Sequence, residues 1–112
     1  MQRTLLGALM GAAMTLVSCG QPSMEGGFDS PVPAARMQAI ERAARAGDRS
    51  PATLKRIVEQ LDSDDPAVRL VAIGALERLT GETHGFRAYD PPIERRAAVR
   101  RWSEYVESES HG

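Results

Sequence analysis

The sequence predicts an all-α fold, a short array of about four helices that follows an N-terminal leader and a flexible tether. Apolar residues recur at three- and four-residue spacing in four segments between positions 33 and 107, which is the period of a helix face. Breaks that contain Pro or Gly separate these segments. The few aromatic residues beyond the tether imply an aliphatic, alanine-rich core, which favours packed helices over a sheet; they are Phe86, Tyr89, Trp102 and Tyr105.

The length of 112 residues allows one small domain. The first 18 residues hold a single charge, Arg3, and removing them leaves 13 basic and 15 acidic side chains, a net charge of −2. Proteins that bind nucleic acid are usually strongly basic, so this balance argues against a nucleic-acid partner. The single cysteine excludes an intramolecular disulfide, and the domain must therefore fold by packing alone.

The leader begins with a short basic segment and continues as an apolar run over residues 5–17, interrupted only by Thr15. This run is shorter than the roughly 20 residues that a membrane-spanning helix needs, and it fits the core of a secretory signal. It ends in Leu16-Val17-Ser18-Cys19, an aliphatic residue and a small residue before the only cysteine. The segment resembles the signal of bacterial lipoproteins, the lipobox, with a signal peptide over residues 1–18.

The resemblance implies a specific modification. The thiolate of Cys19 would take a diacylglyceryl group, a lipoprotein signal peptidase would cut before Cys19, and the new α-amine could be acylated. This covalent lipid is the only attached group that we expect, and it implies a lipid-anchored, extracytoplasmic location on the cell membrane, inner or outer. The alternatives are an ordinary secretory signal with an incidental cysteine, or an uncleaved hydrophobic tail.

Residues 19–32 are rich in Gly, Pro and polar residues without periodicity, which predicts a flexible linker. At about 5–6 Å × √14, its typical reach is roughly 20 Å. Phe28 could contact the domain or the membrane interface, although we favour a plain linker.

Two helices follow the tether. The first is expected over about 32–46, ended by Gly47-Asp48, and its inward face carries Met37, Ile40 and Ala44. Ser50-Pro51 then supplies an N-cap followed by Pro at the first helical position. The inward stripe of the second helix is formed by Leu54, Ile57, Val58 and Leu61.

The third helix is expected over 66–79 and is the most apolar of the four. It starts with Asp65-Pro66, which, like Ser50-Pro51, is a capping residue followed by Pro. In addition to its inward stripe it carries Leu70, Val71 and Ile73 on other faces. A helix that is apolar nearly all round should be covered on more than one side. The inward stripe consists of Val68, Ala72, Ala75, Leu76 and Leu79.

This third segment resembles the second helix of a HEAT repeat. The resemblance covers residues 51–79 well and residues 33–47 weakly, and it implies a HEAT-like helical domain over 33–107. It implies that Asp65 caps the helix and, with Arg69, locks neighbouring repeats together. No second copy of the motif is legible, although such arrays usually need about three units, so we expect about two helical pairs with capped or partner-covered ends. The motif residues are Asp65, Pro66, Val68, Arg69, Ala72, Leu76 and Leu79.

A loop of about a dozen residues separates Gly81 from Pro92, and long loops without secondary structure are often functional. It contains a possible ligand set, His84, Arg87 and Asp90. The last helix should run to about residue 107 with Trp102 closing the open end of the stack, and residues 108–112 should form a disordered tail. The residues expected to be buried in this helix are Ile93, Ala98, Trp102, Tyr105 and Val106.

The sequence offers no Ser or Cys nucleophile in a recognisable setting and no glycine-rich phosphate loop, so no catalytic or metal-binding residue is predicted and we do not expect an enzyme. A His84–Asp90 general-base pair is the alternative. Two groups of arginines are interpreted as solvated helix faces in preference to docking sites for anionic headgroups or for an acidic partner. They are Arg42, Arg45 and Arg49, and Arg95, Arg96, Arg100 and Arg101.

Together these features favour a membrane-anchored interaction or scaffold module without chemistry of its own, with an unidentified protein partner and a monomeric state favoured over a dimer. One alternative is a lyase-like protein that binds a small ligand in the 80–92 loop; another is a purely structural envelope lipoprotein. A loop packed down by Phe86 and Tyr89 favours the structural role of the loop. An open cavity lined by His84, Arg87 and Asp90 favours the ligand role.

Overall fold

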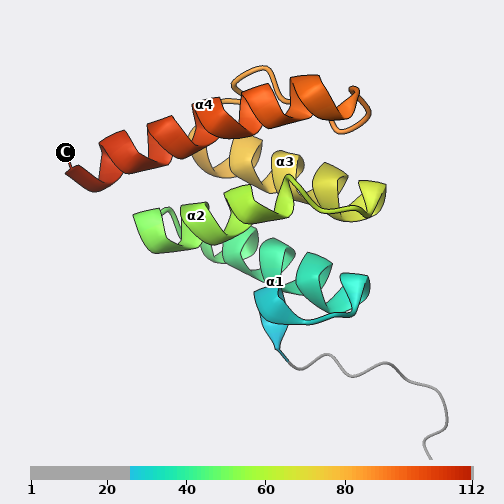
Figure 1. The fold of residues 1–112 in the computed structure, drawn as a ribbon. Helices are drawn as coiled ribbons and strands as arrows, with labels where there is room; N and C mark the ends of the chain where they lie inside the picture. The colour runs from blue at the N-terminus through green and yellow to red at the C-terminus, as the bar shows by residue number, and fades with distance from the viewer. Residues whose placement is uncertain (1–25, 112) are drawn as a thin grey trace, which may run out of the picture.

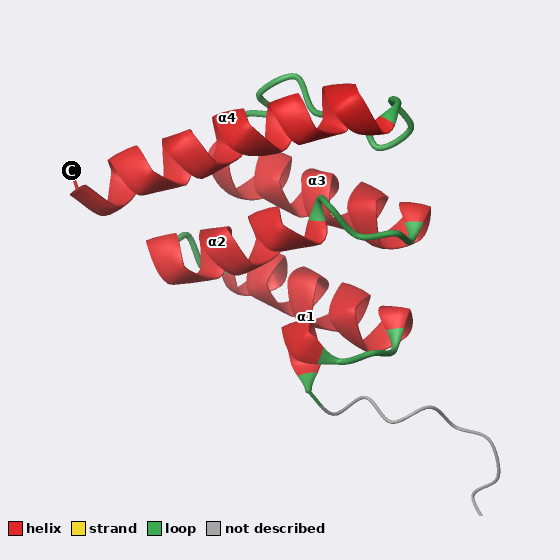
Figure 2. Ribbon diagram, viewed as in Figure 1, coloured by secondary structure: helices red, strands yellow, loops and turns green. Residues whose placement is uncertain are grey.

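The computed structural model describes residues 26–111, and the predicted signal peptide and Cys19 lie outside this range. The described chain forms a short 3-10 turn, η1 (Gly27–Asp29), and four helices: α1 (Pro33–Ala46), α2 (Pro51–Gln60), α3 (Pro66–Thr80) and α4 (Pro92–His111) (Figure 1). Residues 26–111 contain no strand (Figure 2). The predicted all-α class and the number of helices are confirmed.

Local signals set the helix boundaries as expected. The Ser50 hydroxyl accepts a hydrogen bond from the Thr53 amide at 3.3 Å, and the Asp65 carboxylate accepts one from the Ala67 amide at 2.8 Å. Each cap is followed by Pro at the first helical position, where a missing N–H costs nothing. Gly47, which ends α1, has a φ of 66°, a left-handed conformation in which glycine is unstrained.

The helices lie in two layers, with α1 packed on α3, α2 packed on α4, and α2 also in contact with α3 (Figure 1). α2 and α3 are antiparallel, as a helix–turn–helix requires. α4 departs from the expected second pair, because it runs parallel to α3 and antiparallel to α2. Stacked repeats place equivalent helices in the same direction, so α4 covers the stack as a reversed helix and does not continue the array.

The core is aliphatic, as predicted. The stripes of α2 and α3 meet Ile40 of α1 and Trp102 of α4 in one cluster. Trp102 is completely buried, which confirms that it fills the α4 side of the stack. The largest side chains with almost no exposed surface are Trp102, Ile40, Leu54, Ile57, Leu61, Leu76 and Val68.

Two apolar residues are less covered than expected. Ile93 is 68% exposed, because it lies five residues before buried Ala98 and so points about 140° away from it around α4. On α3, Ile73 is buried at 9% exposure, whereas Leu70 is 50% exposed. The prediction that α3 is covered on more than one side is therefore confirmed for Ile73 and wrong for Leu70.

The predicted disordered tail is helical over residues 108–111. No Pro or Gly interrupts the chain before Gly112, so nothing ends the helix at residue 107. Two serine hydroxyls also donate to carbonyls three residues earlier, Ser108 to Tyr105 and Ser110 to Glu107, each at 2.8 Å.

The prediction of a flexible linker over 19–32 is wrong for residues 26–32, which pack on α1 and α2 through η1. Phe28 contacts the core cluster, and its carbonyl accepts a hydrogen bond from the Gln60 amide at 3.2 Å. Asp29 pairs with Arg56 of α2. Ser30 is buried, and its hydroxyl accepts from the Val32 amide at 3.0 Å. Residues 26–32 therefore have the composition of a linker but are docked on the helices.

Candidate functional site

The 80–92 loop runs back along the length of α3. Because α4 is parallel to α3, the connection must travel from the end of one helix back to the start of the other (Figure 1). The loop packs onto the helices as it does so, burying Phe86 at 4% and Ala88 at 5% exposure. This path accounts for the length of the loop without a ligand.

Side chains from two helices hold the loop by its backbone carbonyls. The Trp102 indole Nε1 donates to the Thr83 carbonyl at 2.8 Å, and Arg101 Nε donates to the His84 carbonyl at 2.8 Å. At the other end of the loop, Arg69 Nε donates to the Ala88 carbonyl at 3.0 Å. The loop is thus pinned near both ends and is not an open lid.

His84 is a packing residue in this arrangement. Its ring lies edge-on to Trp102, with centroids 4.4 Å apart, and tilted against Tyr105 at 4.8 Å. Its Nε2 is buried without a hydrogen-bond partner. Its φ of 51° is left-handed, and it precedes Gly85 with a φ of 76°. The loop therefore makes a tight left-handed turn over Trp102.

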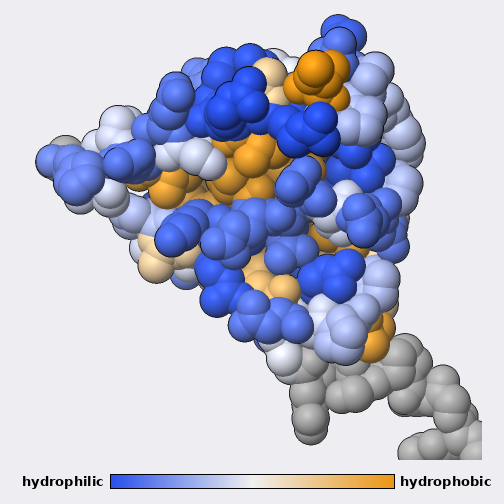
Figure 3. All heavy atoms as spheres, in the orientation of Figure 1, coloured by the Kyte–Doolittle hydropathy of each residue, from blue (hydrophilic) through white to orange (hydrophobic). Residues whose placement is uncertain are grey.

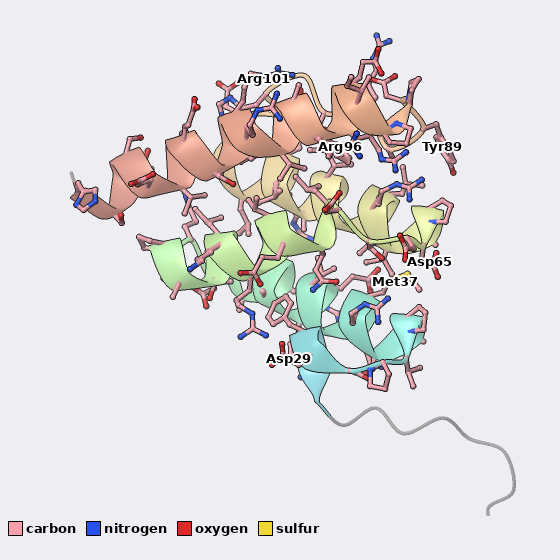
Figure 4. The ribbon with its side chains drawn as sticks, in the orientation of Figure 1. Asp29, Met37, Asp65, Tyr89, Arg96 and Arg101 are labelled. Atoms are coloured by element: carbon pink, nitrogen blue, oxygen red, sulfur yellow. The ribbon has the colours of Figure 1, made fainter. Side chains whose placement is uncertain are left out.

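The structure does not bring the possible ligand set together. His84 packs beside Trp102, whereas Asp90 precedes the start of α4, and the ten residues of helix between Pro92 and Trp102 span about 15 Å. No hydrogen bond within residues 26–111 joins the side chains of His84, Arg87 and Asp90. The general-base pair is therefore not formed. Phe86 packs down as the structural role requires, but Tyr89 points outward and is 74% exposed (Figure 4).

The interpretation of the α4 arginines as a solvated face is wrong for Arg95, which is half-buried, whereas Arg101 is exposed and also binds the loop. Arg95 Nη1 donates to the Asp90 carbonyl at 2.8 Å, and Arg101 holds His84 as described above. Arg96 and Arg100 are exposed. Figure 4 shows Arg96 and Arg101 at separate places on α4. Arginines beside a long loop are a signal that the loop is bound to its helix, but sequence spacing does not show which of them reach it.

A groove between α2 and α4 is a concave surface that sequence reasoning missed. It has a volume of about 570 Å³, and its floor is formed by Val58 and Val106, both almost fully buried. Figure 3 shows apolar surface between the polar rims of the two helices. The groove exists because α4 runs antiparallel to α2, which places residues 103–110 beside residues 51–59 (Figure 1). Its rim is formed by Pro51, Ala52, Lys55, Glu59, Ser103, Glu107 and Ser110.

A smaller hollow of about 350 Å³ lies between the parallel helices α1 and α3. It is open, and charged side chains dominate its edge. The small residues Ala44, Gly74 and Ala75 form its base. Its polar edge is formed by Glu41, Arg45 and Arg78.

Two groups have shifted acidities, and each has a local cause. A hydrogen bond from the Thr53 hydroxyl, followed by bonds from Ser50, lowers the pKa of the Asp48 carboxyl below its usual value. Burial raises the pKa of the Tyr105 hydroxyl, and the nearby Glu109 carboxylate adds to this. Neither shift lies in the groove, so both belong to the packing of the helix ends.

Within the described residues, no three His, Cys, Asp or Glu side chains are placed to hold a metal ion. None of the helices between residues 26 and 111 combines the length and the apolar character that crossing a membrane requires. No family model, curated protein or solved structure matches the chain. The likeness to HEAT repeats therefore stays a prediction from the motif over residues 51–79.

Proposed function

We propose that the protein is a lipoprotein, anchored to the extracytoplasmic side of a cell membrane through a lipid on Cys19, and that it acts as a protein-interaction module without chemistry of its own. The observation that carries the proposal is the tetrad Leu16-Val17-Ser18-Cys19 at the end of an apolar run too short to span a bilayer. A thiol is the nucleophile that this lipid transfer needs. Two or more acyl chains would hold the protein on a bilayer stably.

The interaction role is supported by where the chain offers accessible surface. In the 80–92 loop, Phe86 is buried and side chains of the helices bind the carbonyls of Thr83 and Ala88, which disfavours the small-ligand alternative. The α2–α4 groove instead combines an apolar floor with a rim of both charge signs, as Lys55 and Glu107 show. Such a surface suits a short amphipathic segment of a protein partner.

Fatty-acid labelling of the full chain in a bacterial host tests the anchor. Wild type and Ser18→Ala, which keeps a small residue before the cysteine, should both take up label and remain with the membrane. Cys19→Ala should take up none, because the thioether cannot form. Equal labelling of wild type and Cys19→Ala, or no labelling of either, contradicts the proposal.

Co-purification from detergent-solubilised membranes tests the interaction surface. Ser103→Lys places a bulky charge on the groove rim, and Ser108→Lys places the same charge on an exposed part of α4 outside the groove. A partner that occupies the groove should be lost with the first variant and retained with the second. Retention of the same partners by both variants removes the groove from the proposal.

A further inference from the structure

The docked segment before α1 is held at several points to the edge of the stack. Arg56 of α2 pairs with the Asp29 carboxylate at 2.5 Å, and its guanidinium lies 5.4 Å from the centre of the Phe28 ring. Gln60 binds the Phe28 carbonyl, and Arg36 of α1 donates to the Ser30 carbonyl at 2.8 Å. These contacts join the segment to two helices, so the chain is fixed to the domain from about residue 26 onward.

Docking limits the number of residues that lie between Cys19 and the domain. Between Cys19 and Gly26 there are seven residue steps, which span at most about 25 Å when fully extended. A free linker over 19–32 would have allowed roughly twice the extended length.

The fold places the start of this short chain on one edge of the stack. η1 lies beside α1, and α4 lies on the opposite edge (Figure 1). Packed helices are about 8–10 Å apart and about 10–12 Å wide, so the distance from η1 across to the outer surface of α4 is roughly 25–30 Å. Only a fully extended chain could bring the α4 edge to the membrane surface.

We infer that the lipidated protein rests with its η1–α1 edge against the bilayer surface, and that α4 faces away from it, with the α2–α4 groove opening to the side (Figures 1 and 3). This inference rests on the proposed lipid at Cys19. The exposed charges of α1 include Glu41 as well as Arg42 and Arg45, so the edge has no strong charge of one sign. Chain length, and not attraction to anionic headgroups, sets the orientation, which is therefore insensitive to salt.

Fluorescence quenching on vesicles measures this orientation in the full, lipidated chain. Because the thioether occupies Cys19, a single new cysteine is the only free thiol. Gln38→Cys on α1 and Ser103→Cys on the groove rim, both exposed, each carry one fluorophore. On phosphatidylcholine vesicles with nitroxide-labelled headgroups, the label at position 38 should be quenched severalfold more than the label at position 103, in low and high salt alike.

A double variant that releases the docked segment from the helices is the decisive test. Phe28→Ser with Asp29→Asn removes the ring and the carboxylate charge that Arg56 contacts. The chain between Cys19 and the docked part of the domain then becomes longer. Quenching at the two positions should therefore converge while the protein stays bound. Glu94→Gln, an exposed acid on α4 at the opposite edge of the stack (Figure 1), should leave the difference intact. Equal quenching in the bound wild type overturns the orientation and leaves the anchor standing. Absence of lipid and of vesicle binding overturns the proposed function and the orientation together.

Discussion

Arg69 Nε donates a hydrogen bond to the carbonyl oxygen of Ala88 at 3.0 Å, from a side chain that is only 7% exposed. Nη1 of the same guanidinium donates to the Ser63 carbonyl at 2.8 Å and to the Asp64 carbonyl at 3.3 Å. One buried side chain therefore joins the break before α3 to the end of the return loop. All three acceptors are backbone carbonyls, so the charge is stabilised by peptide dipoles and not by an acidic residue.

Arg69→Ala should destabilise the domain by about 2–3 kcal/mol, because a charged donor is lost and partly buried carbonyls are left without it. Arg78→Ala, on an exposed part of the same helix, should change the free energy of unfolding by less than about 0.5 kcal/mol. Urea denaturation of the soluble fragment 20–112 measures both. Similar effects of the two substitutions would show that the guanidinium of Arg69 does not hold the loop.

Leu76 is completely buried at the centre of the α3 stripe, so Leu76→Ala should cost about 2–5 kcal/mol. Domains of this size hold only about 3–5 kcal/mol, and most of the helical signal should be lost at 37 °C. Leu70→Ala is the matched control, since that side chain is half exposed. Circular-dichroism melts compare the two, and an unchanged melt for Leu76→Ala would remove it from the core.

Two glycines should respond to alanine in opposite directions. Gly74 is exposed inside α3 with no atom within 4 Å of an added Cβ, so Gly74→Ala should stabilise the protein by about 0.5–1 kcal/mol. Gly85 has a φ of 76°, and its Cβ would lie 2.8 Å from Arg101 Nη2. Gly85→Ala should therefore cost about 1–2 kcal/mol and disturb the bond from Arg101 to His84. Shifts of the same sign in thermal melts would contradict the loop geometry.

The stability of the domain should depend on pH in the acidic range because of Asp48. Its carboxylate accepts from the Thr53 hydroxyl at 2.7 Å and the Ser50 amide at 3.1 Å, and these bonds lower its pKa below the usual 3.8. A depressed folded-state pKa gives a contribution that is full above the unfolded value and is lost as the pH falls through the folded value. Asp48→Asn should therefore differ from wild type at neutral pH and converge with it below about pH 4. A stability difference that does not change with pH would rule out the charged cap.

The helices and most of their boundaries could be predicted because their signals are local. Ser50 and Asp65 cap amides only two or three residues away, and the inward stripes repeat within a single helix. Such interactions depend on the helical period, which the sequence displays directly. The class of the fold and its aliphatic core follow from the same signals.

The missed features that shape the surface of the molecule join distant residues. Arg56 and Asp29 are 27 positions apart, and the segment around Asp29 has the composition of a linker. The direction of α4 depends on the path of the loop, which Arg69 and Trp102 fix only once the helices are packed. The α2–α4 groove follows from that direction, so it could not be found before the topology was known.

We expect the soluble fragment 20–112 to be a monomer at micromolar concentration. Ile73, which a partner could have covered, is buried by the fold itself, and Trp102 is sealed beneath the return loop. Stable dimer interfaces bury large, mainly apolar surfaces, whereas the described residues expose only three large apolar side chains. Those side chains are Leu70, Tyr89 and Ile93.

Sedimentation velocity of wild type and Leu70→Ser tests the monomer. Both should sediment as one species with the mass of a single chain, because Leu70 is not expected to form a dimer interface. A wild-type dimer that Leu70→Ser dissociates would contradict the closed monomer and move the interaction surface from the α2–α4 groove to α3. A dimer that persists in Leu70→Ser but dissociates in Ser103→Lys would instead make a second copy of the chain the occupant of the groove.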